Sequence, residues 1–289
     1  MPRGLFPDRE PLRSLHNSRI RLAKGLMVSR ERRYELRKFV IEGTRLVEEA
    51  LKAGIDLEFI MYASDRGQDG GVMSLLEAAS DLGVPIVPVV PELMNRISDT
   101  ATSQGVIAVG NMPPAGVGAI LEIPLEKAPL VLVCDQLRDP GNLGTILRSA
   151  WAFGASGAIL TAGTCDLYNP KVLRATMGAS FHMPVAQSDQ PAGEVLREAK
   201  NQGFTVVATS ARAPLYCHEY DFVRPAVIAI GNEAWGISQQ TAEVADDLVS
   251  IPMPGRAESL NAAVAASIIL YEAAKQRLVR GMQLCYNSS

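Results

Sequence analysis

The sequence has 289 residues, of which 47% are hydrophobic and 20% charged, with a net charge of −3; it is long enough for two globular domains and too apolar for a disordered chain. Its four cysteines, Cys134, Cys165, Cys217 and Cys285, form no CxxC pair and its three histidines do not cluster, which argues against a zinc site or a disulfide framework. No apolar run reaches the roughly 18–20 residues that span a bilayer, and no secretory signal is recognisable, so we expect a cytoplasmic protein without a metal or a membrane contact.

Basic residues gather near the beginning of the chain. Residues 13–45 hold ten Arg and Lys residues against three acidic ones, so the remainder of the chain is acidic. A basic stretch on an acidic body is typical of a protein that places one face against nucleic-acid phosphates. The same charges also fit a solvated helix with ion pairs at i,i+4 spacing, and charge alone leaves both interpretations open.

Short apolar runs alternate with helical patterns in the first half of the chain. Strands are predicted at residues 39–41, 59–62, 85–90 and 106–109, and helices at residues 44–53 and 72–82. This alternation predicts a small α/β domain with a partly parallel sheet. Residues 111–129 then hold four prolines, a density typical of a linker. We therefore expect a first domain at residues 1–112, a linker at residues 113–128 and a second domain at residues 129–289.

The second half carries stronger strand patterns. Residues 130–134 are apolar throughout, as in a strand that is covered on both faces. Further strands are predicted at residues 158–160, 204–208, 226–230 and 248–251, and helices at residues 143–153, 170–179, 191–202, 238–244 and 259–279. The pattern predicts an open, largely parallel α/β sheet. Ligands of such sheets bind at the carboxyl ends of the strands, so functional residues are expected in the loops that follow.

The first of these loops, residues 135–144, reads DQLRDPGNLG and leads into a helix that contains Arg148. Pro140 and Gly141 form the tight turn, and Asn142 is the expected helix N-cap. Strand, glycine turn and capped helix occur together in many α/β proteins. The loop has neither the GxGxxG fingerprint nor the Walker lysine, so it indicates no dinucleotide or P-loop site.

Two later loops carry glycine and polar residues at strand ends. Residues 228–237 read IAIGNEAWGI, where Gly231 is expected to let a ligand approach the backbone and Glu233 to orient a cation or a hydroxyl. Trp235 in this loop either stacks on a ligand or packs, and the sequence does not decide. Residues 251–261 read IPMPGRAESLN and run into an Ala-rich helix, for which Ser259 is a candidate N-cap.

Together the three loops resemble the motifs of the SpoU (TrmH) class of SPOUT methyltransferases. That family has an Asn-x-Gly-(x)3-Arg segment, a GNE-x-x-G segment and an IPM…SLN segment, and this chain matches all three in order between about residues 130 and 276. Ala262-Ala263, where relatives often carry Val-Ser, is the one departure, and we interpret it as packing. The first half resembles the substrate-binding domain that precedes many SpoU domains. This second resemblance rests on fewer residues, FVIEG at 39–43 and SQGV at 103–106.

The resemblance implies a fold and an activity. The fold would be α/β, with a C-terminal SPOUT domain that has a mostly parallel sheet and a deep trefoil knot, and a smaller N-terminal α/β RNA-binding domain resembling a ribosomal protein. The activity would be methyl transfer from S-adenosyl-L-methionine to a ribose 2′-hydroxyl of RNA, with 23S-type ribosomal RNA as the favoured substrate. The protein would be a homodimer through its C-terminal domain.

The resemblance also implies site residues. The expected catalytic residues are Asn142, Arg148, Glu233, Ser259 and Asn261. The expected cofactor-binding residues are Thr209, Ile230, Gly231, Ile251, Met253 and Leu260. An arginine is always protonated, so we expect Arg148 to stabilise a developing alkoxide or to hold a phosphate rather than to act as a base. Asn142 would fix its position, and Glu233 would orient Arg148 or the ribose.

Several alternatives stay open from the sequence. The substrate could be transfer RNA, or the chain could be a non-catalytic RNA-binding or ribosome-assembly protein on the same fold. A nucleotide-dependent oxidoreductase is a further alternative, although the glycine fingerprint is missing. Arg174 could touch the RNA backbone or lie on a solvated face. A housekeeping role and an antibiotic-resistance role are both compatible with the motifs.

Overall fold

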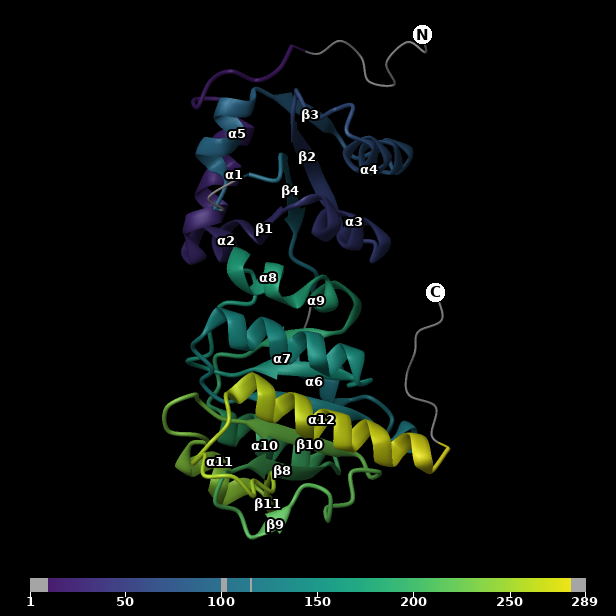
Figure 1. Cartoon of the computed structure of the whole chain (residues 1–289), viewed down its shortest axis with the longest axis vertical. Helices are drawn as coiled ribbons and strands as arrows, with labels where there is room; N and C mark the ends of the chain where they lie inside the picture. Colours follow the sequence, from purple (N-terminus) through teal and green to yellow (C-terminus); the bar gives the residue numbers. More distant parts are fainter. Residues whose placement is uncertain (1–9, 100–102, 115, 282–289) are drawn as a thin grey trace. The chain divides into compact units, whose positions relative to one another are not determined.

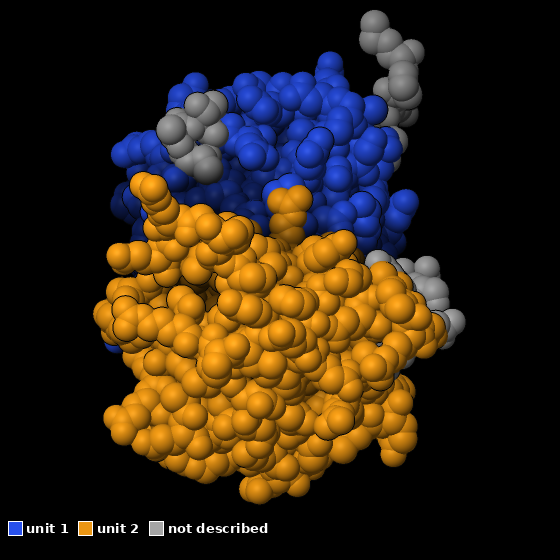
Figure 2. All heavy atoms as spheres, turned by 60° about the horizontal axis from the view of Figure 1, so that its bottom comes forward, with its two compact units in different colours: residues 1–114, 168–181 blue, residues 115–167, 182–289 orange. Residues whose placement is uncertain are grey.

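The computed structural model describes residues 10–99, 103–114 and 116–281. Cys285 and the outer ends of the two expected domains lie outside these residues. Contacts divide the chain into two compact units, coloured separately in Figure 2: Met1–Pro114 with Tyr168–Phe181, and Ala115–Leu167 with His182–Ser289. Within the described ranges, no helix combines the length and the apolarity that a bilayer crossing requires. Nor does any group of three His, Cys, Asp or Glu side chains in those ranges have an arrangement that could hold a metal ion.

The first unit is built on a mixed four-stranded sheet. Its strands are β1 (Lys38–Glu42), β2 (Leu57–Ala63), β3 (Ile86–Val89) and β4 (Val106–Asn111), in the order β1-β4-β2-β3. Its helices include α1 (Ser18–Val28), α2 (Arg30–Leu36), α3 (Thr44–Lys52), α4 (Gly70–Asp81) and α5 (Pro91–Ile97). Helices α1 and α5 cover one face of the sheet, and α3 and α4 lie on the other (Figure 1). The β2–β3 pair is parallel and the pairs with β4 are antiparallel, so the sheet is partly parallel as predicted.

The basic stretch forms the two short helices α1 and α2, which meet at Ser29. The Ser29 hydroxyl caps α2 by accepting from the Arg32 backbone N–H. The buried Arg33 side chain turns back and donates to the Leu26 carbonyl at the end of α1, over 2.6 Å. One of the ten basic residues is thereby used inside the fold, whereas Arg21 and Lys24 are exposed on α1.

A segment from the second half of the sequence completes the first unit. Residues 168–181 carry α8 (Pro170–Thr176) and begin α9 (Ala179–His182). The rings of Tyr168 and Phe181 pack against Phe39 of β1, with centroids 4.9 and 6.1 Å apart. Arg174 forms an ion pair with Asp99 at 2.7 Å. Arg174, for which the sequence left an RNA contact and a solvated face open, thus has an acidic partner within the first unit.

The second unit is built on a seven-stranded sheet in the order β7-β6-β5-β10-β8-β11-β9, and its strand pairs are all parallel. The strands are β5 (Leu130–Cys134), β6 (Gly157–Leu160), β7 (Val185–Gln187), β8 (Thr205–Thr209), β9 (Leu215–Tyr216), β10 (Ala226–Ile230) and β11 (Asp247–Ser250). This confirms the predicted α/β fold with a mostly parallel sheet. Strands β7 and β9 were not predicted, because runs of two or three residues carry no periodic signal.

Helices cover both faces of this sheet. They are α6 (Val117–Leu121), the short 3-10 turn η1 (Leu125–Lys127), α7 (Pro140–Ala152), α10 (Ala192–Asn201), α11 (Gln239–Val244) and α12 (Ala262–Val279). Apolar residues of α6, α10 and α11 form one core cluster with alternate residues of the strands. Helices α7 and α12 pack side by side on the other face (Figure 1).

Two predicted helix caps are wrong. The N-cap of α7 is Asp139, whose carboxylate accepts from the Asn142 backbone N–H over 2.7 Å, and the N-cap of α12 is Asn261. Asn142 and Ser259 were expected in these places. Asp139 takes the cap because Pro140 follows it at the first helical position, where a missing N–H costs nothing. The Asn142 side chain is left free to bond outside its own helix.

Candidate functional site

The strand order brings the three sequence motifs to one edge of the second sheet. Strands β5, β10, β8 and β11 are neighbours and run parallel, so their carboxyl ends lie at the same edge. The motif loops at residues 135–139, 231–236 and 251–261 follow β5, β10 and β11. A ligand at this edge would meet all three loops at once.

A chain of side-chain hydrogen bonds joins the three motifs. The Asn261 amide nitrogen Nδ2 donates to Asn142 Oδ1 over 2.9 Å. The Asn142 Nδ2 in turn donates to Glu233 Oε1 over 3.2 Å. The structure thus brings together Asn142, Glu233 and Asn261, three of the five expected catalytic residues, although each comes from a different loop.

The Glu233 carboxylate fastens the β10 loop to the β5 loop. Besides Asn142, it accepts from the backbone N–H groups of Arg138 and Asp139 over 3.2 and 3.0 Å. Burial raises the pKa of Glu233, but hydrogen bonds from Asp139, from its own backbone, from Asn142 and from Arg138 outweigh that effect and leave the pKa below its usual range. Glu233 is therefore an anion at neutral pH whose acceptor oxygens are engaged by the loop and by Asn142.

Asn232, to which the sequence assigned no role, holds the same two loops together. This residue is buried, and its Nδ2 donates to the Gln136 carbonyl over 2.7 Å. Its Oδ1 accepts from the Ala234 N–H over 2.8 Å, and its backbone exchanges two hydrogen bonds with Gly236. The signal was an amide residue directly after a strand-end glycine, a place where a buried amide satisfies backbone groups.

Asp135 is a second residue that the sequence did not single out. Its buried carboxylate accepts from the Ser238 N–H over 2.8 Å and from the Thr241 hydroxyl over 2.7 Å. It thereby holds the first turn of α11 beside the end of β5. Its partners lie about a hundred residues away in the chain, so no local pattern could have indicated them.

Gly231 has a reason to be glycine in addition to the predicted approach of a ligand. A Cβ atom there would lie 2.2 Å from both the Gly236 carbonyl carbon and the Ile237 nitrogen. The glycine is required by the close return of its own loop, which Gly236 completes with a positive φ of 75°. The neighbouring Ile230 is 2% exposed, and its carbonyl accepts from the Asp135 N–H over 2.8 Å.

Arg148 lies apart from the hydrogen-bonded group. It is exposed on α7 and makes no hydrogen bond or ion pair with any described residue. Arg148 follows Asn142 by six positions. On an α-helix this spacing corresponds to about 9 Å along the axis and about 120° around it. Within one chain, the structure shows no contact by which Asn142 or Glu233 would orient Arg148.

The segment at residues 251–260 is open. In the described part of the chain, its backbone makes no hydrogen bond. Ile251 and Met253 are partly exposed, Leu260 is 37% exposed, and Ser259 is exposed. Thr209, half-buried, ends the neighbouring strand β8. Unpaired backbone groups beside apolar side chains fit a small molecule that has both an apolar part and hydrogen-bonding groups.

Two protein-family models match the chain. The model of the SpoU rRNA Methylase family matches residues 129–271. The model of the MRM3-like substrate binding domain matches residues 17–108. The first match contains the three motif loops, and the second contains α1, α2, strands β1 to β3 and the beginning of β4.

Characterised relatives match over almost the whole chain. The 23S rRNA (uridine(2479)-2′-O)-methyltransferase of Streptomyces viridochromogenes is 32% identical over 91% of this chain and 91% of its own length. The 23S rRNA (guanosine(2553)-2′-O)-methyltransferase RlmP of Bacillus subtilis is 34% identical over 90% of this chain and 97% of its own. The crystal structure of the SpoU methyltransferase AviRb from Streptomyces viridochromogenes with AdoMet matches with a TM-score of 0.79 at 31% identity, over 91% of this chain and 98% of that one.

Proposed function

The chain belongs to the SpoU rRNA methylase family, and we propose that it transfers the methyl group of S-adenosylmethionine to a ribose 2′-hydroxyl of large-subunit ribosomal RNA. The observation that carries this proposal is the hydrogen-bonded chain Asn261–Asn142–Glu233 at the carboxyl edge of the sheet, beside the open segment at residues 251–260.

The open segment fits S-adenosylmethionine. The backbone groups of residues 251–260 have no partner in the described chain, and the exposed apolar side chains beside them suit the adenine ring. We assign to this binding the six residues Thr209, Ile230, Gly231, Ile251, Met253 and Leu260. Ile230 and Gly231 are buried, so they would shape the floor of the site rather than touch the cofactor with a side chain. When bound, the cofactor supplies an electrophilic methyl group.

The hydrogen-bonded group would orient the ribose. Both the oxygen and the nitrogen of the Asn142 side-chain amide are hydrogen-bonded, so the position of this side chain is fixed before the substrate binds. Glu233 has its oxygens engaged, and we assign it the positioning of Asn142 rather than proton transfer. Ser259 lies two residues before Asn261 with an exposed hydroxyl, which would complete the pocket. Arg148 would supply the cation that stabilises the developing alkoxide.

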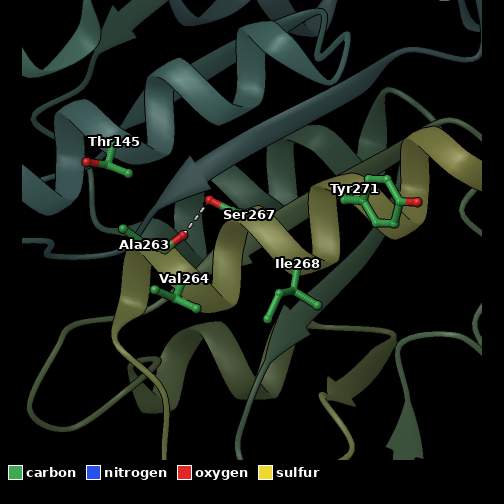
Figure 3. A pocket seen from close by; sticks show the side chains of 6 residues that line it. All are labelled: Thr145, Ala263, Val264, Ser267, Ile268 and Tyr271. Carbon is green, nitrogen blue, oxygen red and sulfur yellow. Dashed lines mark hydrogen bonds between the residues drawn. The ribbon is translucent and has the colours of Figure 1, made fainter.

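A second copy of the chain would bring Arg148 into a site. Helices α7 and α12 enclose a groove of about 310 Å³, lined by Thr145, Ala263, Val264, Ser267, Ile268 and Tyr271 (Figure 3). Val264, Ile268 and Tyr271 share one helix face and are 36–56% exposed. Arg148 follows Thr145 by three residues on α7, so it lies on the side of the helix that borders this groove. In a homodimer packed through this groove, Arg148 would lie at the interface and reach the partner's site.

The side chains of α12 divide between a buried face and an exposed face. Ala263, Ala266, Ile269 and Leu270 are buried within the unit, whereas Ile268 is 36% exposed. The dimer contact would therefore use Ile268 and its exposed neighbours rather than the alanines. We expect Ile268→Asp to convert a dimer into a monomer in sedimentation analysis and to abolish methyl transfer. A wild-type protein that sediments as an active monomer would contradict the dimer.

The path of the C-terminal segment supports a trefoil knot. In the sheet, β8 and β10 separate β11 from β5. Residues 251–261 nevertheless lead from β11 to Asn261, which bonds to Asn142 just after β5. The segment thus crosses the ends of β8 and β10, as a chain that passes through a loop of the domain would. A crystal structure traced through residues 231–281 would test the knot directly.

The first unit would bind the substrate RNA. The basic helices α1 and α2 lie within the match to the substrate-binding domain. Nine of the ten basic residues at 13–45 remain outside the core; Lys38 is ion-paired with Glu58, and the other eight are exposed and could contact phosphates. We propose residues 1–112 as the RNA-binding domain, which resembles a ribosomal protein, and residues 129–289 without 168–181 as the methyltransferase domain. The expected linker at residues 113–128 instead holds α6, whose Ile120 and Leu121 are buried in the core of the second unit. The protein would act in the cytoplasm, where its RNA substrate is located.

The test is methyl transfer in vitro. The purified chain is incubated with labelled S-adenosylmethionine and with ribosomal RNA or transfer RNA, and the RNA is digested to nucleosides. We expect label in a 2′-O-methylnucleoside from large-subunit ribosomal RNA. Label in a methylated base, or label only in transfer RNA, would overturn the assigned reaction or substrate. Cofactor binding without transfer to any RNA would indicate the non-catalytic alternative.

A further inference from the structure

An exposed tryptophan and an arginine are stacked on the loops of the proposed site. Trp235 is 58% exposed, and the guanidinium carbon of Arg138 lies 5.2 Å from the centroid of its ring. Trp235 belongs to the loop after β10, and Arg138 to the loop after β5. Both side chains therefore stand at the sheet edge that carries the hydrogen-bonded group.

The two loops hold this pair in place. Glu233, two residues before Trp235, accepts from the backbone N–H of Arg138. Asn232 and Gly236 exchange backbone hydrogen bonds of 2.8 and 2.9 Å, so Trp235 lies within a closed turn. The same Glu233 carboxylate bonds to Asn142, which places the pair next to the group that would orient the ribose.

The pair offers an aromatic face and an unneutralised cation. Arg138 forms no ion pair with a described residue. RNA bases stack on aromatic rings and on guanidinium planes, and a guanidinium also attracts the phosphates on either side of a stacked base. The only other tryptophan, Trp151, is 42% exposed and already stacked on His182, with ring centroids 5.0 Å apart. Trp235 has no such aromatic neighbour among the described residues.

We propose that Trp235 and Arg138 form a stacking platform for an unpaired base of the substrate RNA, next to the ribose that is methylated. This inference rests on the proposed function, because it takes the RNA to enter at this edge of the sheet. It assigns the platform to recognition of RNA and not to binding of the cofactor, which the open segment would hold.

Four variants test the platform by steady-state kinetics with a fragment of large-subunit ribosomal RNA. Trp235→Leu removes the aromatic face and is expected to raise KM for RNA about tenfold, while Trp235→Phe keeps a face and stays within about threefold of the wild type. Arg138→Ala is expected to raise KM several-fold. Arg197→Ala removes an exposed, unpaired arginine of α10 and serves as the matched control, with KM unchanged. Affinity for S-adenosylmethionine and the melting temperature should stay at wild-type values in all four.

Tryptophan fluorescence provides a second test of the platform, which requires RNA binding but no methyl transfer. In a Trp151→Phe background, Trp235 is the sole tryptophan, and the RNA fragment should quench its emission. In Trp235→Phe, the remaining Trp151 should be insensitive to the same RNA.

If the wild type methylates RNA but Trp235→Leu keeps KM within twofold and no quenching occurs, the platform is wrong and the proposed function stands. A Trp235→Leu protein that loses cofactor affinity or stability in step with activity would also overturn it, because the indole would then serve the loop. If the wild type methylates no RNA, the proposed function fails, and quenching still decides whether Trp235 contacts RNA.

Discussion

Two regions at the same edge of the second sheet are built in opposite ways. In the tied loops, residues 135–139 and 231–236, side chains of Asn232, Glu233 and Asn142 join one loop to the other by hydrogen bonds. In the open segment, residues 251–260, the described backbone makes no hydrogen bond. The difference suits two tasks: polar groups fixed before the reaction need no reorganisation in the transition state, whereas an open backbone can exchange water for a ligand.

The largest effect is expected from a residue that belongs to neither region. Arg148→Ala should lower the rate of methyl transfer by about 100-fold or more, since in the proposed mechanism Arg148 supplies the cation that stabilises the developing alkoxide. Affinity for S-adenosylmethionine should stay within a few-fold, because the open segment is untouched. Single-turnover kinetics and calorimetry measure the two quantities, with Arg197→Ala as the control. A near-normal rate would remove Arg148 from the mechanism.

Glu233→Gln tests the tied loops themselves. The variant replaces an oxygen acceptor by an NH2 group that faces N–H donors, so Asn142 and the β5 loop lose part of their support. We expect turnover to fall about tenfold, because the proposed mechanism requires Asn142 in a fixed position and the variant no longer holds it there. Cofactor affinity should fall less than turnover. An equal loss of both would show that the two regions do not act separately.

The same residue predicts a dependence of stability on pH. The pKa of Glu233 is lower in the folded protein, so its hydrogen bonds contribute stability that is complete above the unfolded pKa of about 4.3 and is lost as pH falls through the lower folded pKa. The melting-temperature difference between wild type and Glu233→Gln should therefore be constant near neutral pH and shrink below about pH 4. A difference that stays constant down to pH 3 would contradict the lowered pKa.

Two glycines, one in a tied loop and one in the open segment, test the difference between the two regions at the level of the backbone. Gly231 lies against Gly236 and Ile237 in a tied loop, whereas a Cβ on Gly255 of the open segment would meet no atom within 4 Å. Gly231→Ala should destabilise the protein by about 1–3 kcal/mol through overpacking. Gly255→Ala should stay within about 0.5 kcal/mol of the wild type. Denaturant titration measures both, and equal effects would show that the tied loop can move aside.

The smallest effect is expected in the first unit. Arg21→Ala with Lys24→Ala removes two exposed charges from α1 and should weaken RNA binding a few-fold at moderate salt. The slope of log Kd against log salt should decrease by about one for each phosphate that the variant no longer neutralises. Substitution is preferable to deletion of the N-terminal half, because α8 packs against β1 and would be left without its partner. An unchanged slope would exclude α1 from the RNA-binding surface.

Elements with a local signal, such as an apolar run or a motif, could be predicted from the sequence. Features that depend on contacts between residues far apart in the chain could not. The apolar runs of β5 and β10 predicted the sheet, and the resemblance of the motif loops to the SpoU class implied Asn142, Glu233 and Asn261, which the structure joins by hydrogen bonds. Residues 168–181 belong to the first unit through contacts with residues that are far away in the chain, among them the rings of Tyr168 and Phe181 on Phe39 and the Arg174–Asp99 ion pair.

The prediction from the local sequence was also wrong where two nearby residues could each act as the N-cap of a helix. Asp139 and Asn142 can both cap a helix, and only the structure shows that Asp139 does so. Gly231 was expected to let a ligand approach the backbone. The close return of its own loop is a further reason for glycine at this position, and no spacing in the sequence reveals it.

The most direct measurement maps ribose 2′-O-methylation across the ribosomal RNA of the organism that encodes this chain. Three strains are compared: one with the intact gene, one with the gene deleted, and one in which the gene carries Arg148→Ala. We predict that one nucleotide of the large-subunit RNA is methylated in the first strain and unmethylated in the other two. Identical methylation of ribosomal RNA in the intact and deleted strains would contradict the proposed function.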